Sequence, residues 1–552
     1  MPFIRRRSRL RRRRLASVVL LVAIFGLVPA TASAQIDVTQ EGGRPSWAGA
    51  WSPTAPIADL ARQPLSNVLS ISSLLLSPAP RVGLLWTVGT PGALAWEVAD
   101  ERAEFSVAKD DRSGAFRRPL DPGKISNVIG SGSAWGRLGE RGAGIGRIAV
   151  DRAQFDDGVF SNVLRPYSTE PYAILDTLGH ATSGTIVVLE GAGGWKMGRV
   201  GFGIGLGYRS REVRTVASAV PRIHTVAAPG ITAGLNYEVL SGKLGIGVFT
   251  RWQQSAEALR IYSVAAASRV YQLSGYDEPV RTDLTATWFS QRFERNAWAH
   301  GVALGGETSG ISWTLFTQRE QNAAFNFNTT YGDENADRWD ADGWTGGAAV
   351  QTHLSNDRLL ATAHACYTTL SGEARHYELE GVPFIADESR FSIVGEVQLL
   401  PGTSWEFSAE VGVTRDERRR TDGLAEVYTD LRIWRPVAAF EVARWLGGSV
   451  ALSAAGILAE HNPAGSIPLK TQMGAAYGNW IAPELALEAS EARGKAGALT
   501  FLWQARPATA FWIQARHATV TPAQRGAGSI FDRPDGERTG WRLAMGVALG
   551  RR

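Results

Sequence analysis

Residues 231–252 read ITAGLNYEVLSGKLGIGVFTRW, and hydrophobic residues alternate with polar or small ones along most of this stretch. Successive side chains of a β-strand point to opposite sides, so a period of two residues is typical of a strand with one apolar face. The alternation stops at Ser241-Gly242 and then resumes, although Phe249 interrupts the polar face. Two such strands joined by a two-residue turn predict a β-hairpin.

The same alternation recurs in residues 391–399, 405–413, 499–505 and 541–549. A soluble sandwich or barrel would turn its apolar face inward, whereas a membrane barrel turns it toward lipid and lines its lumen with the polar face. Many of the predicted strands reach about ten residues, the length that a tilted strand needs to cross a bilayer. Their polar face is rich in Gly, Ser, Thr and isolated charges, which also favours the membrane barrel.

The connections between the predicted strands alternate between short and long. Short turns are predicted near residues 139–142, 198–200, 241–242, 308–310, 355–358, 401–403, 446–448 and 506–508. Long polar loops are predicted near residues 111–124, 159–183, 214–230, 255–296, 327–342, 377–388, 418–425, 461–483 and 522–536. This alternation is typical of outer-membrane barrels, which have short periplasmic turns and longer external loops.

The turn pattern also gives a strand count. Eight short turns make eight hairpins and therefore 16 strands. One strand before the first long loop, at about 103–110, and one after the last, at 537–550, raise the number to 18. The predicted fold is therefore all-β, a transmembrane antiparallel β-barrel of about 18 strands. The range is 16–20, because residues 255–296 and 461–483 are long enough to hold a further pair.

Tryptophan supports the membrane interpretation. The tryptophans predicted to lie close to short turns are Trp135, Trp195, Trp298, Trp313, Trp405, Trp445, Trp503 and Trp512. Aromatic rings prefer the interface between membrane and water, so these residues predict a girdle on the periplasmic side. Ordinary hydrophobic packing is the alternative for any single member.

The first 34 residues have the composition of an export signal. Eight arginines lie within residues 1–14, residues 15–30 are apolar, and Ala32-Ser33-Ala34 matches a small-x-small cleavage site. We predict a signal peptide over residues 1–34, with an uncleaved anchor as the alternative, and localisation in the cell outer membrane. Without these arginines the 58 basic residues fall to 50, against 53 acidic ones. A nucleic-acid binder needs a basic face, so that class loses its compositional support.

Two segments resemble a known family. They are Arg165-Pro166-Tyr167 through Asp176, followed by Glu190 in the next strand, and Val270-Tyr271-Gln272-Leu273-Ser274-Gly275-Tyr276 in a long loop. Over most of the mature chain, the sequence resembles a poorly characterised family of outer-membrane β-barrels of Bacteroidota and related bacteria. The resemblance implies a barrel fold, but it supplies no substrate and no catalytic residue.

Two stretches imitate binding motifs. Gly201, Gly203, Gly205 and Gly207 have a spacing of two and not the G-x-G-x-x-G of a nucleotide loop, so they predict one strand face without side chains. The acidic residues 333–342 begin like an EF-hand, but an arginine replaces its turn glycine and a tryptophan its bidentate glutamate. We predict a solvated external loop there and leave open a looser Ca²⁺ site.

No catalytic or metal-binding motif is recognisable. The eight histidines form no H-E-x-x-H, the sequence contains no G-x-S-x-G, and the single Cys366 excludes a cysteine-based metal site. We therefore expect no enzyme, no cofactor and no metal. Arg418, Arg419 and Arg420 are predicted near the tip of a long loop, either solvated or in contact with lipopolysaccharide phosphates.

The sequence predicts three parts: the signal peptide, an N-terminal periplasmic or lumen-lining segment in residues 35–102, and the outer-membrane barrel in residues 103–552. The leading functional hypothesis is a porin-like channel for small solutes. The alternative is a surface binding or structural barrel with a closed lumen, followed by an outer-membrane enzyme. Expected partners are outer-membrane lipid and lipopolysaccharide, the barrel-assembly machinery and small solutes.

Seven charged residues are predicted to line the lumen, because they lie on the polar faces of the predicted strands. They are Arg209, Glu238, Arg390, Glu396, Glu406, Glu410 and Arg542. Their signs are mixed, which predicts no strong ion selectivity.

Overall fold

The structure is a computed structural model. It describes residues 91–97, 101–115, 123–161, 172–216, 222–240, 243–262, 270–274, 288–308, 310–328, 336–354, 359–375, 384–399, 404–423, 427–466, 482–523 and 536–550. The predicted signal peptide and most of the predicted N-terminal segment lie outside these residues.

Nearly all of the described chain is β-strand. The strands are β1 (Arg102–Gly114), β2 (Lys124–Arg137), β3 (Gly142–Ser161), β4 (Tyr172–Met197), β5 (Val200–Thr215), β6 (Arg222–Leu240), β7 (Leu244–Tyr262), β8 (Val270–Ser274), β9 (Trp288–Thr308), β10 (Ile311–Asn328), β11 (Ala336–Leu354), β12 (Leu359–Arg375), β13 (Phe384–Leu399), β14 (Trp405–Asp422), β15 (Val427–Leu446), β16 (Val450–Ser466), β17 (Ala492–Arg506), β18 (Thr509–Pro522) and β19 (Arg538–Gly550). The helical elements are η2 (Pro91–Ala93), α5 (Leu94–Glu97) and α6 (Ala482–Glu488). No helix among these described residues is long and apolar enough to span a membrane.

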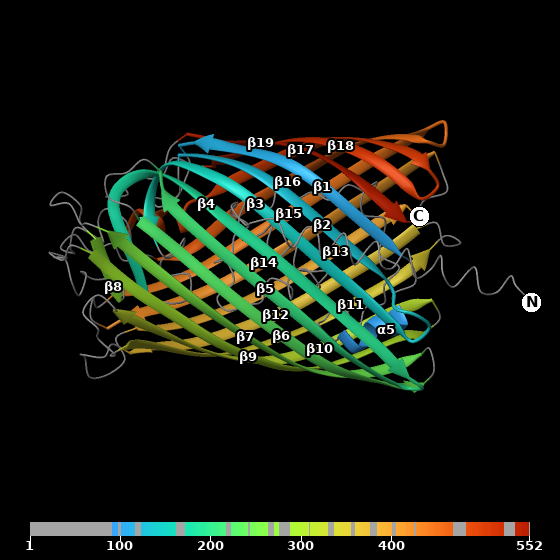
Figure 1. Cartoon of the computed structure of the whole chain (residues 1–552), viewed down its shortest axis with the longest axis horizontal. Helices are drawn as coiled ribbons and strands as arrows, with labels where there is room; N and C mark the ends of the chain where they lie inside the picture. Colours follow the sequence, from blue (N-terminus) through green and yellow to red (C-terminus); the bar gives the residue numbers. More distant parts are fainter. Residues whose placement is uncertain are drawn as a thin grey trace, which may run out of the picture.

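Eighteen of the strands close into one antiparallel barrel (Figure 1). Barrel strands that follow one another in the chain are hydrogen-bonded neighbours, and β1 pairs with β19 along its whole length, which closes the sheet. The remaining strand, β8, is only five residues long and pairs with the first residues of β4. The predicted all-β antiparallel barrel of about 18 strands is confirmed.

The two ends of the barrel differ in their connections. All eight predicted short turns fall between consecutive strands, for example between Met197 and Val200, and they lie at the end where β1 begins and β19 ends (Figure 1). We call this the short-turn end and the opposite one the long-loop end. Closed barrels leave no unpaired strand edge, which is the requirement for a sheet in lipid.

The strands extend further toward the long-loop end than predicted. The predicted loop 255–296 is shortened from both sides, because β7 continues to Tyr262 and β9 begins at Trp288. The prediction of an acidic loop over residues 333–342 is wrong for residues 336–342, since β11 begins at Ala336. Arg418, Arg419 and Arg420 are likewise not at a loop tip, because β14 continues to Asp422.

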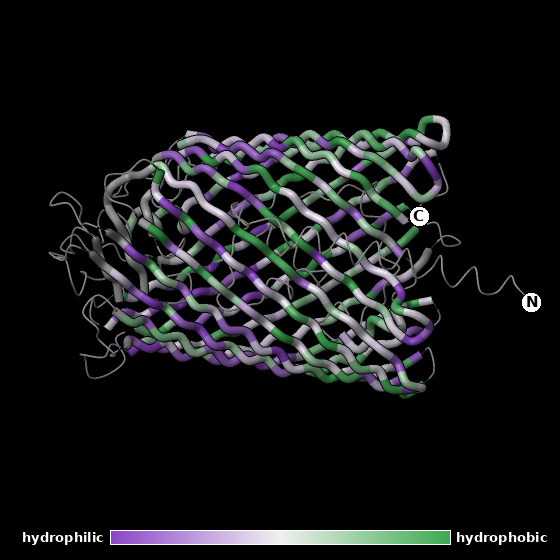
Figure 2. The backbone as a smooth tube through the Cα atoms, in the orientation of Figure 1, coloured by the Kyte–Doolittle hydropathy of each residue, from purple (hydrophilic) through white to green (hydrophobic). Residues whose placement is uncertain are grey.

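The outward face of the strands is apolar near the short-turn end. On β14, for example, Trp405, Phe407 and Val411 are exposed and share the outward face. Hydrophobic and hydrophilic residues alternate along the barrel strands (Figure 2). At about 3.4 Å per residue and a tilt of about 40°, residues 405–413 rise through about 21 Å, close to the apolar band of roughly 25 Å in outer-membrane barrels. This band fits the hydrocarbon core of a membrane.

Beyond the apolar band, the same outward face carries ion pairs. They are Lys109–Asp111, Glu212–Arg214, Arg292–Glu294, Arg319–Asp342, Arg338–Asp340, Glu373–Arg375, Arg415–Glu417, Arg419–Asp430 and Glu460–Arg493. Charges on a lipid-facing surface are costly at the bilayer midplane and cheap in water. The barrel wall therefore continues past the membrane on the long-loop side.

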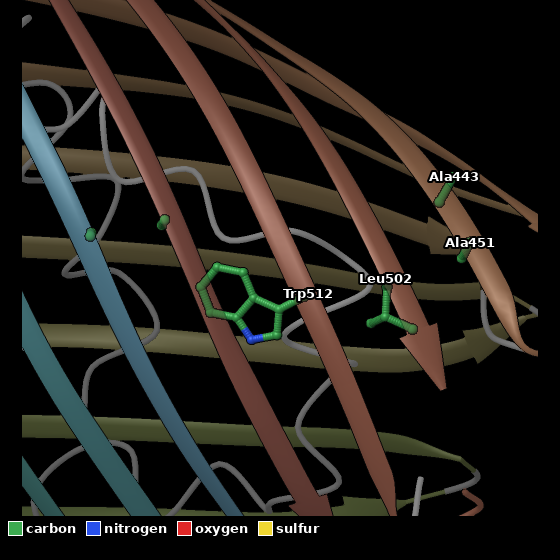
Figure 3. Packing of buried hydrophobic residues seen from close by; sticks show 6 residues of the cluster. Ala443, Ala451, Leu502 and Trp512 are labelled. Atoms are coloured by element: carbon green, nitrogen blue, oxygen red, sulfur yellow. The ribbon is translucent and has the colours of Figure 1, made fainter. Parts of the chain in front are cut away.

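The predicted tryptophan girdle is partly wrong. Trp195, Trp405 and Trp503 point outward near the short turns, as predicted. In contrast, Trp445 and Trp512 lie on the inward face of their strands, and Trp135 packs inward against Leu94. Trp512 belongs to an inner apolar cluster with Leu502, Ala443 and Ala451 (Figure 3). Its ring covers Gly546 of the neighbouring strand, which explains why an apolar side chain is stable on the inner wall.

Candidate functional site

The barrel interior is the candidate site, because the inward faces of the strands gather polar and charged side chains there. Alternate residues of each strand point inward, as the pleat requires. The inward face of β14 carries Glu406, Glu410, Asp416, Arg418, Arg420 and Asp422, while the apolar and exposed residues of the same strand point outward. The seven residues predicted to line the lumen all share the inward face of their strands.

One group of inward side chains joins four neighbouring strands, and we call it the Asp416 cluster. It consists of Arg390 on β13, Asp416 and Arg418 on β14, Arg435 on β15 and His461 on β16. Arg390 and Asp416 are direct register partners. The Asp416 carboxylate accepts hydrogen bonds from Arg390 and Arg435 and lies 3.4 Å from Arg418 Nη2. Arg435 Nε also donates to His461 Nδ1 at 3.1 Å.

A second inward group, the Glu257 cluster, joins β6, β7 and β9. Arg295 Nη1 donates to Glu257 Oε1 at 2.9 Å, and His224 Nε2 lies 3.3 Å from Glu257 Oε2. On β1, Arg112 binds Asp110 through two hydrogen bonds, of 3.1 and 2.8 Å. These buried charges are therefore met by partners of opposite sign, as the low dielectric of an interior requires.

A layer of glutamates lies nearer the short-turn end. On β13, β14 and β15 an inward glutamate stands six residues closer to that end than Arg390, Asp416 and Arg435, respectively; these residues are Glu396, Glu410 and Glu441. Glu396 and Glu410 are direct register partners, and Ser408 Oγ donates to Glu396 at 3.4 Å. Six strand residues span about 20 Å. Along these strands, the inner wall thus carries Arg390 and Arg435 nearer the long-loop end and the three glutamates nearer the short-turn end.

Residues 91–97, which belong to the predicted N-terminal segment, lie against the inner wall at the short-turn end. Residues 91–95 are buried, and Pro91 lies against a row of three glycines that are register partners on β4, β5 and β6: Gly194, Gly203 and Gly234. A Cβ added at Gly203 would lie 2.4 Å from the Pro91 carbonyl carbon. Arg137 Nη1 donates to the backbone oxygen of Ala95 at 3.3 Å. The predicted side-chain-free face therefore accommodates a piece of the chain's own backbone.

Sequence reasoning missed most members of the two charged clusters. Asp416 and Arg418 lie in a stretch where both faces of β14 are charged, so no apolar alternation identified it as a strand. The two histidines, His224 and His461, showed no motif spacing, because their partners come from other strands. Among the described residues, no group of three or more His, Cys, Asp or Glu could hold a metal ion.

A closed antiparallel barrel with an apolar outer band and a charged interior defines a transmembrane β-barrel protein. Residues 93–549 match a family described as "Family of unknown function (DUF6850)", and the chain belongs to this family. A search of the curated proteins found no match.

Several solved structures are similar to the barrel. One is the ferric preacinetobactin receptor BauA of Acinetobacter baumannii, at 6% identity and a TM-score of 0.36, covering 81% of this chain and 80% of that one. A second is the ferric citrate transporter FecA in its unliganded form, at 11% identity and a TM-score of 0.40, covering 82% and 79%. A third is the deltaS2 mutant of the monoaromatic hydrocarbon channel TodX, at 11% identity and a TM-score of 0.30, covering 84% and 93%.

Proposed function

We propose that the protein is an outer-membrane channel that lets small solutes cross the membrane, in the manner of a porin. The observation that carries the proposal is the opposite polarity of the two barrel faces, apolar outside and charged inside. A barrel of 16 to 18 strands is wide enough to enclose an aqueous path when its interior is not filled. Arg209, Glu238, Arg390, Glu396, Glu406, Glu410 and Arg542 would then line that path.

The proposed cellular setting follows from the apolar outer face of the barrel and from the composition of residues 1–34. The signal peptide in residues 1–34 would export the chain, the barrel-assembly machinery would insert it, and lipid and lipopolysaccharide would surround it in the cell outer membrane. Residues 35–102 would form the periplasmic or lumen-lining segment. A distribution in Bacteroidota and related bacteria stays a prediction of the sequence resemblance.

Single-channel recording in a planar bilayer tests the channel. The purified full-length protein, shown to be folded by its heat-modifiable mobility on gels, should produce discrete conductance steps in a potassium chloride solution. Folded protein that never conducts would refute the channel proposal.

That negative result would favour the alternative, a surface binding or structural barrel with a closed lumen. One observation supports this alternative, namely the N-terminal segment seated on the inner wall at Gly203.

A further inference from the structure

We infer that the Asp416 cluster is a binding site for the oxyanion group of a solute, a carboxylate or a phosphate. The inference rests on the proposed function, because a solute has to enter the barrel to reach these side chains. It goes beyond that function in naming the charge and chemistry of the solutes that the interior retains.

The first argument compares donors with acceptors. A carboxylate offers about four lone-pair positions, whereas each guanidinium offers five N–H donors. Arg390 donates to Asp416 through two nitrogens, Arg435 through one, and Arg418 Nη2 approaches at 3.4 Å, so the acceptor positions of Asp416 are taken. Arg390 Nη1 is buried and has no hydrogen-bond partner. The cluster therefore holds a donor that Asp416 cannot satisfy, on an arginine whose side chain is 16% exposed.

The second argument concerns charge. Arg390 and Arg435 both bind the single carboxylate of Asp416, and the other hydrogen bond of Arg435 goes to a histidine nitrogen that accepts it. The neighbouring Arg420 pairs with Glu388 at 2.8 Å, which adds no net charge. Two guanidinium groups therefore share one carboxylate. Fork-shaped guanidinium groups are suited to binding carboxylate and phosphate.

The third argument concerns the route to the site. The cluster lies toward the long-loop end of β13 to β15, and the glutamate layer lies about 20 Å along the strands on its short-turn side. An anion that enters from the long-loop end passes Asp422 and the pair of Arg420 and Glu388 before it reaches the cluster, and it meets Glu396 and Glu410 only beyond the cluster. The opposite order would place a repulsive layer in front of the site. The arrangement thus favours capture of anions that come from outside the cell.

A purely structural role is the competing explanation, since the cluster ties four strands together. Ion pairs that only hold strands together need matched charges, because an unmatched buried charge is costly. A structural role also predicts that substitutions in the cluster change the stability of the barrel, and that the folded protein does not bind added anions. Binding of an anion to the folded protein therefore separates the two explanations.

The test uses the full-length protein in detergent and inorganic phosphate as the probe. Calorimetric titration should detect saturable phosphate binding to the unaltered protein. Arg390→Gln should weaken it about tenfold or more, because a hydrogen bond to a charged group is worth at least about 1.4 kcal/mol, which is tenfold in affinity. Asp416→Asn should tighten it, since the internal competitor for the guanidinium groups is gone.

The control is Arg319→Gln, which removes an arginine that pairs with an aspartate, Asp342, on the outer surface of the barrel. It should leave phosphate affinity unchanged. Absence of phosphate binding, or equal affinity in the Arg390→Gln variant, would overturn the inference. If Asp416→Asn does not reach the heat-modifiable folded form, Arg435→Gln replaces it and is expected to weaken binding.

Conductance separates the inference from the proposed function. In a conducting protein, phosphate at the concentration that saturates the site should reduce the chloride current, and acetate should do so at higher concentration. Conductance without any phosphate effect would overturn the anion site and leave the channel standing. Phosphate binding to a protein that never conducts would overturn the channel and support the site.

Discussion

Substitution of Gly203 by alanine should release the N-terminal segment from the barrel wall. The new Cβ would lie 2.4 Å from the carbonyl carbon of Pro91, 2.5 Å from its oxygen and 2.6 Å from the nitrogen of Gly92. Separations below 3.0 Å do not occur for real Cβ atoms, so either the strand or the segment has to move. Gly203 is paired on both sides, to Gly194 and to Gly234, and this ladder holds the strand in place. The segment is therefore the part that yields.

The magnitude follows from what the segment buries. Leu94 is 0% exposed and packs against Ala143, with Trp135 and Ile145 beside it. Removing one buried leucine side chain from its apolar surroundings costs roughly 1.5–3 kcal/mol. Since about 1.4 kcal/mol is a factor of ten, the seated state should lose tenfold to about a hundredfold in population.

Hydrogen–deuterium exchange measured by mass spectrometry reports this release directly. The peptide that contains residues 91–97 should exchange at least about tenfold faster in the Gly203→Ala variant. The matched control is Gly395→Ala, because a Cβ at Gly395 meets nothing within 4 Å. Unchanged exchange in the Gly203→Ala variant would refute the reasoning, since it would mean that the contact with Pro91 does not hold the segment.

Two further predictions concern the membrane. Val248 points outward and is 45% exposed, so Val248→Lys should cost roughly 2–4 kcal/mol near the bilayer midplane and impair assembly, whereas Gly247→Ser on the inward face should not. Heat-modifiable mobility of the two variants measures the difference, and equal tolerance would mean that the faces are assigned wrongly. An epitope tag inserted within residues 524–535 should be labelled by antibody on intact cells, and a tag at Gly448 should not. Labelling of the tag at Gly448 alone would show that the barrel has the opposite orientation in the membrane.

The strand number could be predicted from the sequence because the two-residue period of a β-strand coincides with the division between a lipid-facing side and an interior side. Where a strand crosses lipid, one face has to be apolar and the other faces the interior, so the residues alternate visibly, as in residues 405–413. Short turns interrupt the alternation and can be counted. The count was correct because each crossing contains at least one such stretch.

The same reasoning explains why the upper parts of the strands were missed. Beyond the apolar band, Arg415, Glu417 and Arg419 face outward into water, while Asp416 and Arg418 face inward. Both faces are charged there, so the hydrophobic period disappears although the backbone ladder to β15 continues. A strand in water on one side and in a polar interior on the other resembles a loop in composition.

The interior contacts could not be predicted from any single strand. That Arg390 and Glu396 both point inward follows from the alternation of residues along β13 alone. That Arg390 meets Asp416 depends on the register between β13 and β14, and that Arg435 reaches the same carboxylate depends on the next pair of strands. The register between two strands is fixed by turn geometry together with packing, and the hydrophobic pattern of one strand does not contain this information.

The segment and the anion site lie at different levels of the barrel, and this separation can be tested. Gly203 is near the short-turn end of β5, whereas Asp416 is nearer the long-loop end of β14. Releasing the segment should widen the path at the short-turn end without altering the guanidinium groups around Asp416. The Gly203→Ala variant is therefore expected to conduct more and to bind phosphate with an affinity within about twofold of the unaltered protein. A change in phosphate affinity that follows the release would show instead that the seated segment and the arginines form one coupled unit, since a ligand and a conformational change alter each other only through a difference in binding free energy.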